Sequence, residues 1–518
     1  MVRDYKGNDF SMEDEQLAKG CKKWISATHI CRQWRHMALA SPILWSLIRI
    51  PGGKLQDVPF AQMCLQRSGS APLVILVEKE AITRVLEGII DLVRVHAEHV
   101  RCLKLVAKKT HEQLFHIDFP LPMLHTLELR AARAGKPRQH SISNPLHFPS
   151  LRVLALENAD NPWELDFSIF PLLTSLKIKG RHRGAKSTAT QYFGLLSTLR
   201  NLVVLELDRF PIPTQLAADR DITISLPALR HLTISHWPSH IRTVVDRLEI
   251  PSDANIHVTF YQSEGRPDEA HLVKHTITRL LCRSTATSVQ DVALSRAQDP
   301  AGVPIKLSCC AISLTNWGGW YMEIQCRTSC LQHNATGFLP LRINFADWDV
   351  EDEVPSADIM SSHLSGFCQA VSSCQFKCLH FAGPSMCDEA SILVEFLPRF
   401  SDICLLEMET IDLSGCISDL HDWHIDGHVL RLQRIILTAL RSGSEGDYLP
   451  EALKHYVSCV LPESLLVQVK DQTSLLFDLP KELQGVVDDV EVSLLSDEEA
   501  MKRTNWCRHF GSDAPWFV

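Results

Sequence analysis

Leucine and isoleucine recur in pairs separated by one residue along the first half of the chain. Six such Leu-x-Leu or Leu-x-Ile cores begin at Leu103, Leu127, Leu154, Leu176, Leu205 and Leu232. Most have a further leucine three residues earlier, at Leu124, Leu151, Leu173, Leu202 and Leu229. Alternate side chains of a β-strand point to opposite faces, so each core predicts a strand with two buried apolar residues and an outward residue between them.

The spacing of these cores predicts how the strands are connected. Successive cores lie 24, 27, 22, 29 and 27 residues apart, and leucine-rich repeats have periods of roughly 20–29 residues. One repeat cannot close its own core, so the leucines become buried only when neighbouring repeats stack. We therefore expect an α/β fold with an irregular leucine-rich-repeat solenoid over residues 67–250, whose parallel strands form the concave face.

The outward strand positions are the candidate contacts for a partner. Their charged members have mixed signs, which indicates no single charge class of partner. These candidate target-binding residues are Lys104, Glu128, Arg130, Glu157, Lys177, Lys179, Glu206 and Asp208.

Outside the six cores the pattern is less regular. Residues 1–20 are polar and are expected to be disordered. Leu73–Val77 predicts a strand, and apolar positions at helical spacing within residues 80–99 predict an amphipathic helix. Weaker patterns predict a degenerate continuation of the array over residues 251–440, with a helix near 269–284. Residues 441–518 are expected to form a cap, because an open end would expose the core.

A separate helical pattern precedes the array, within residues 21–66. From Trp24 to Ala38, apolar or small residues recur at gaps of three and four, which places them on one face of a helix. Pro42 then ends this helix, and Leu44 and Trp45 follow as a second apolar group. We expect Trp34 to pack within the helical module, and Leu44 and Trp45 to contact a partner.

This segment resembles the C-terminal half of an F-box. Cys31-Arg32-Gln33-Trp34-Arg35 followed by Ser41-Pro42-Ile43-Leu44-Trp45 is similar to the family's Cys-x-x-Trp-Arg helix and Pro-x-Leu-Trp turn. The flanking residues 67–73 resemble F-box families of mushroom-forming fungi. The resemblance implicates Trp24, Thr28, Ile30, Cys31, Trp34, Arg35, Leu39, Pro42, Leu44 and Trp45 in adaptor binding.

The resemblance implies a particular function. It implies docking to a Skp1-like adaptor of a cullin–RING ubiquitin ligase, the SCF complex, in the cytoplasm or nucleus. The repeats would then present an unknown target protein as a substrate receptor. However, residues 1–20 do not match the Leu-Pro-x-Glu-Ile helix that begins the family's motif. The alternative is therefore a leucine-rich-repeat interaction scaffold with no ligase role.

Composition and motifs favour binding over catalysis. The net charge of −9 is atypical of a nucleic-acid-binding protein, and no apolar run approaches the ~18 residues of a membrane span. His421, His424 and His428 form the densest group of possible metal ligands, but Gly427 interrupts a helix there. The sequence contains neither a P-loop nor a Gly-x-Ser-x-Gly motif. We expect no enzymatic activity, cofactor or metal.

Overall fold

Two units make up the chain, Met1–His231 and Leu232–Val518. The computed structural model describes residues 31–50, 57–77, 81–107, 117, 119–131, 148–158, 170–180, 189–210, 223–251, 254–261, 269–281, 309–316, 320–327, 341–346, 365–371, 378–383, 403–410, 417, 432–439, 453–457, 462, 464–469, 487 and 489–494. The predicted disordered segment, residues 1–20, lies outside these ranges. The structure is mixed α/β, and both units contain runs of parallel strands.

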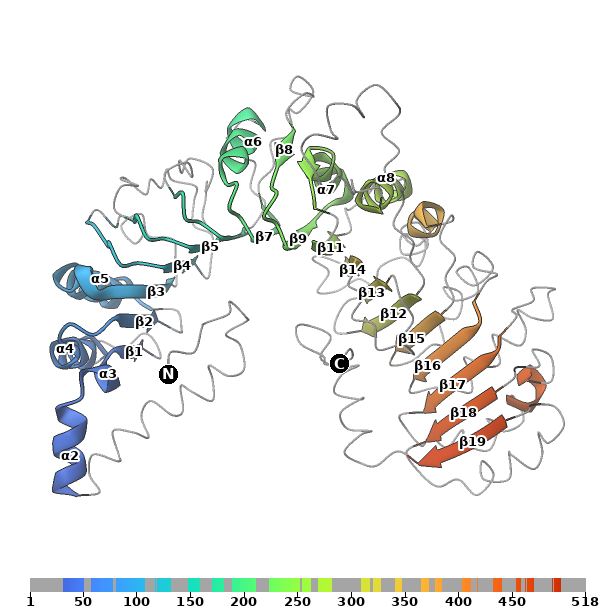
Figure 1. Cartoon of the computed structure of the whole chain (residues 1–518), viewed down its shortest axis with the longest axis horizontal. Helices are drawn as coiled ribbons and strands as arrows, with labels where there is room; N and C mark the ends of the chain where they lie inside the picture. The colour runs from blue at the N-terminus through green and yellow to red at the C-terminus, as the bar shows by residue number, and fades with distance from the viewer. Residues whose placement is uncertain are drawn as a thin grey trace. The chain divides into compact units, whose positions relative to one another are not determined.

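A parallel sheet forms the first unit (Figure 1). Within the described residues its strands pair with one another in chain order, each parallel to the next. They are β1 (Leu47–Ile50), β2 (Leu73–Val77), β3 (Val100–Ala107), β4 (Thr126–Ala131), β5 (Val153–Glu157), β6 (Ser175–Lys179) and β7 (Val204–Asp208). The short strand β8 (Ile224–Ser225) follows. Parallel pairing of the first five Leu-x-Leu cores is thus confirmed.

The leucines of these cores stack in register across the sheet. Leu103, Leu127, Leu154, Leu176 and Leu205 are direct partners on adjacent strands, and each is at most 1% exposed. The leucines three residues before these cores, from Leu124 to Leu202, are equally buried. The residues between them are more exposed, so alternation along each strand separates an apolar face from a polar face.

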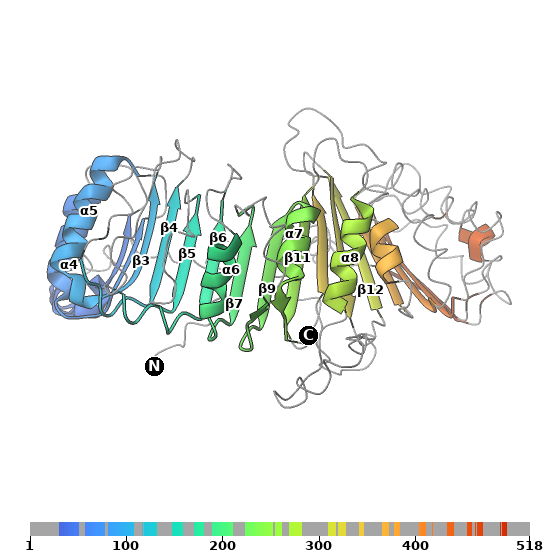
Figure 2. The ribbon, with the colours of Figure 1, turned by 90° about the horizontal axis from the view of Figure 1, so that it is seen from above.

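Helices pack along the outer side of this sheet. α4 (Asp57–Ser68) and α5 (Thr83–Val95) lie beside the first strands in Figure 2. α5 buries Val85, Leu86, Ile89 and Val93, which confirms the amphipathic helix predicted within residues 80–99. The unit also contains α2 (Arg32–Leu39), α3 (Pro42–Trp45), the 3₁₀ turn η1 (Ala97–His99) and α6 (Ala189–Thr198).

The second unit combines helices with a mixed sheet. Its elements are β9 (His231–His236), α7 (Pro238–Val245), β10 (Leu248–Glu249), β11 (Asn255–Tyr261), α8 (Ala270–Leu281), β12 (Cys309–Asn316), β13 (Trp320–Arg327), β14 (Leu341–Ala346), β15 (Cys378–Gly383), β16 (Leu405–Thr410), β17 (Arg434–Ala439), β18 (Ser464–Val469) and β19 (Asp489–Leu494). α8 coincides with the helix predicted near 269–284, and β9 contains the sixth Leu-x-Ile core.

One part of the second sheet departs from the predicted parallel continuation. β13 pairs antiparallel with both β12 and β14, while β11 pairs parallel with β14 and β12 pairs parallel with β15. Only residues 317–319 separate β12 from β13. A parallel crossover needs about a dozen residues or more, so this short connection reverses the chain. The prediction of an all-parallel array was wrong here.

Parallel pairing also continues further than the sequence predicted. β15 to β19 pair in chain order, each parallel to the next. β18 and β19 lie inside residues 441–518, for which only a cap was predicted. Leu465 and Val467 of β18 are buried, like Ile435 and Leu437 at the register positions of β17. The same alternation that buries β17 therefore extends into the predicted cap.

Candidate protein-binding surfaces

The segment with the F-box resemblance forms a corner of two short helices. Cys31 caps α2, because its Sγ accepts a hydrogen bond from the Trp34 N–H at 3.4 Å. α2 ends at Leu39, and Pro42 occupies the first turn of α3, where its missing N–H costs no helical hydrogen bond. Trp24, Thr28 and Ile30 lie outside the described residues.

Trp45 holds this corner against the rest of the first unit. Its side chain is only 2% exposed, and its indole Nε1–H donates to the Ala38 carbonyl oxygen at 2.8 Å. The guanidinium carbon of Arg67, on α4, lies 4.3 Å from the centre of the Trp45 ring. Such a cation–π contact adds to apolar burial. Trp45 therefore links the C-terminal end of α2 to α4.

Large apolar side chains around Trp45 remain exposed. Trp34 is 56% exposed and Ile43 is 72% exposed, and three neighbours are more than a third exposed. We call this group the α2–α3 surface: Trp34, Met37, Leu39, Ile43 and Leu44. Cys31, Arg35 and Pro42 are also exposed beside it.

These exposures reverse the roles expected for the two tryptophans. Trp34 was expected to pack inside the module, but it is exposed. Trp45 was expected to contact a partner, but it is buried. The sequence places both tryptophans in an apolar pattern and does not distinguish their roles. In the structure, the turn at Pro42 brings the Trp45 indole back to the Ala38 carbonyl oxygen of α2. Met37 and Ile43, which were not among the predicted adaptor-binding residues, are also exposed.

The predicted target-binding charges pair with one another. Lys104 contacts Glu128 at 3.2 Å and Arg130 contacts Glu157 at 2.9 Å. Lys177 contacts Glu206 at 3.0 Å and Lys179 contacts Asp208 at 3.5 Å. Each pair joins residues that are direct partners on adjacent strands. We call these eight residues the charge ladder.

The charge ladder forms a polar face in which the positive and negative charges balance. Its side chains are between 12% and 56% exposed. Opposite charges on adjacent strands stabilise a sheet modestly. A partner that covered this face would have to desolvate charges that are already paired. The net charge of the ladder is therefore not expected to provide affinity for a target.

A double-mutant cycle on Lys177 and Glu206 measures how strongly the ladder stabilises the sheet. We expect a coupling of about 0.2–1 kcal/mol from Lys177→Ala, Glu206→Ala and the double variant, because both side chains remain partly hydrated. Urea denaturation of the full chain gives the free energies of unfolding. Lys177→Ala with Arg94→Ala on α5 is the control, and this pair should show no coupling. Zero coupling between Lys177 and Glu206 would contradict the ion pair.

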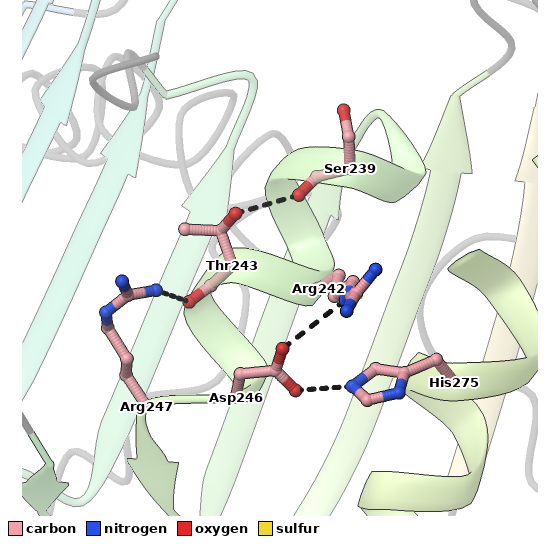
Figure 3. Close-up of polar contacts among 6 residues, drawn as sticks. All are labelled: Ser239, Arg242, Thr243, Asp246, Arg247 and His275. Atoms are coloured by element: carbon pink, nitrogen blue, oxygen red, sulfur yellow. Dashed lines mark hydrogen bonds and ion pairs between the residues drawn. The ribbon is translucent and has the colours of Figure 1, made fainter. Parts of the chain in front are cut away.

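Polar contacts in the second unit join two helices (Figure 3). Asp246 Oδ1 lies 2.7 Å from His275 Nε2 on α8, and Asp246 Oδ2 accepts from Arg242 Nε at 3.4 Å. Arg247 donates to the Thr243 carbonyl oxygen at 3.0 Å. Asp246 follows the last residue of α7, so these contacts tie that end of α7 to α8. These contacts thus have a structural role in holding α7 and α8 together.

Among the residues that the structure describes, no group of three or more His, Cys, Asp or Glu side chains could hold a metal ion. The cluster His421, His424 and His428 lies outside them. No described helix is long and apolar enough to span a membrane.

Two comparisons with known proteins found no match. No model of a protein family matches the sequence, and no curated protein matches it significantly. We therefore infer the function from the residues and geometry described above.

Proposed function

We propose that the chain is an F-box-type substrate receptor with a leucine-rich-repeat solenoid. In this proposal, a Skp1-like adaptor of a cullin–RING ubiquitin ligase binds the α2–α3 surface. The repeats hold a target protein for ubiquitin transfer by other subunits. The observation that carries the proposal is the exposure of large apolar side chains within the short segment that resembles an F-box.

This exposure is concentrated in one place. The described residues include nine exposed large apolar side chains, and five of them belong to the α2–α3 surface. Isolated exposed apolar residues are normal, but five of them between Trp34 and Leu44 favour a protein–protein interface. Tryptophan is also among the residues that dominate binding energy at interfaces. Trp34 is therefore the expected aromatic anchor for the adaptor.

The buried Trp45 supports the proposal in a different way. It fixes the α2–α3 corner through the Ala38 carbonyl and the Arg67 guanidinium. A preorganised surface loses less conformational freedom when it binds. The F-box motif thus supplies exposed contacts from Trp34 and Leu44, and a structural anchor from Trp45.

Replacing Leu44 with alanine should weaken adaptor binding. An interface anchor contributes about 2 kcal/mol or more, which corresponds to roughly thirtyfold in Kd. The measurement is a calorimetric titration of purified Skp1-like adaptor into the full chain and the variant. Circular dichroism should show unchanged folding, because Leu44 is 42% exposed.

Leu172→Ala provides the matched control for this titration. Leu172 is 47% exposed and precedes β6, away from α2 and α3 in sequence, so its loss should leave the Kd unchanged. If the wild type does not bind adaptor at tens of micromolar, the receptor proposal fails and the scaffold alternative replaces it. If Leu44→Ala binds as tightly as the wild type, the adaptor uses another surface.

A further inference from the structure

Three basic residues lie in a row where strands β3, β4 and β5 of the first sheet begin. We call Arg101, His125 and Arg152 the edge row. The His125 N–H donates to the Arg101 carbonyl oxygen at 2.8 Å, and the Arg152 N–H donates to the His125 carbonyl oxygen at 2.9 Å. These bonds place the three residues at the starts of adjacent strands, whose backbones are about 4.8 Å apart.

The edge row differs in charge pattern from the charge ladder. On the ladder, charged partners on adjacent strands have opposite signs. On the edge row, His125 stands between Arg101 and Arg152 along the line of backbone hydrogen bonds, and no residue of the row is acidic. Within the described part of the chain, neither Arg101 nor Arg152 has an ion-pair partner. Both are exposed.

Among the residues that the structure describes, no carboxylate forms an ion pair with this row. Glu98 lies three residues before Arg101 and is exposed on η1. Glu128 lies three residues after His125 but contacts Lys104. The pKa of His125 is lowered, first by burial and then by the positive charges of Arg101 and Arg152. The positive field at this edge therefore reaches the imidazole.

We propose that the edge row binds a phosphoryl group. Two strand spacings separate the Cα atoms of Arg101 and Arg152 by about 9.6 Å, a span that two arginine side chains can close around one oxyanion. Guanidinium groups suit this role because they donate paired, charge-assisted hydrogen bonds to phosphate oxygens. The anion offsets the repulsion between the two arginines, and His125 stands between them in the row. This site is independent of adaptor docking.

The phosphoryl group could be free phosphate or part of a phosphorylated protein. Exposed Met123 lies two residues before His125, beside the row, where it offers an apolar contact to a peptide but none to inorganic phosphate. Two probes therefore separate the sources: inorganic phosphate, and a short phosphoserine peptide with its unphosphorylated form.

The test is a calorimetric titration of each probe into the full chain at a pH of about 7. The double variant Arg101→Gln/Arg152→Gln should bind at least tenfold more weakly than the wild type, because it loses the charge-assisted hydrogen bonds. Arg84→Gln/Arg94→Gln removes two arginines from α5 and controls for net charge. Circular dichroism should show that both double variants are folded.

Each outcome decides the proposal. Binding of both phosphate and phosphopeptide, weakened only in the edge-row variant, supports it. Tighter binding of the phosphopeptide then assigns the site to a phosphorylated protein, and equal binding assigns it to free phosphate. The proposal is overturned if neither probe binds at about 10 mM, if the unphosphorylated peptide binds equally well, or if the α5 variant loses as much affinity as the edge-row variant.

Discussion

Replacing Trp45 with alanine is expected to lower the free energy of unfolding by about 3–5 kcal/mol, as for other buried aromatic residues. The side chain is 2% exposed, donates to Ala38 and lies against the Arg67 guanidinium. Its removal leaves a cavity and an unpartnered guanidinium face. Urea denaturation followed by circular dichroism measures the loss, and hydrogen exchange should show faster exchange at α2 and α3.

Trp34→Ala is the matched control. Trp34 is 56% exposed and belongs to the same corner, so its replacement should change the free energy of unfolding by less than about 0.5 kcal/mol. It should nevertheless weaken adaptor binding, if the proposed docking surface is right. Equal destabilisation by the two variants would contradict the assignment of Trp45 as the structural anchor and Trp34 as the exposed contact.

Leu205→Ala is expected to cost about 2–5 kcal/mol, the range for a leucine removed from a well-packed core. Leu205 has no exposed surface and lies in register with Leu176 on β6. Because parallel neighbours bury each other's leucines, a cavity in β7 also reduces the packing of β6. The measurement is urea denaturation of the full chain.

Leu172→Ala is the control for Leu205→Ala, because it makes the same chemical change on a side chain that is 47% exposed. It should cost less than about 0.5 kcal/mol. If Leu205→Ala also lowered the free energy of unfolding by less than about 0.5 kcal/mol, Leu205 would lie outside the core. That result would contradict the stacking of leucines across adjacent strands.

Strand positions could be predicted in the first unit because their pattern is local. A Leu-x-Leu core carries its own alternation, and each predicted core from Leu103 to Leu205 lies in a strand with buried leucines. The intervals between cores are long enough for parallel connections, and the strands pair accordingly. No strand was predicted over Cys309–Asn316, so the sequence analysis did not recognise that only three residues connect β12 to β13 and that the chain must reverse there.

The candidate surfaces were predicted only in part. The sequence identified the eight charged residues of the ladder, since each occupies an outward strand position. It did not reveal that Lys177 meets Glu206, because these residues are 29 positions apart in the chain. The edge row escaped notice for the same reason, as His125 and Arg152 become neighbours only through the stacking of separate repeats.

Local sequence patterns were enough to predict strands β2 to β7 and the helix that ends before Pro42, because alternation, helical spacing and proline act between near neighbours. Which tryptophan is buried and which charges meet became clear only from the folded structure. Burial and charge pairing depend on residues far apart in the chain. Trp45 is buried because α4 brings Arg67 against it, and no periodicity around residue 45 contains that contact.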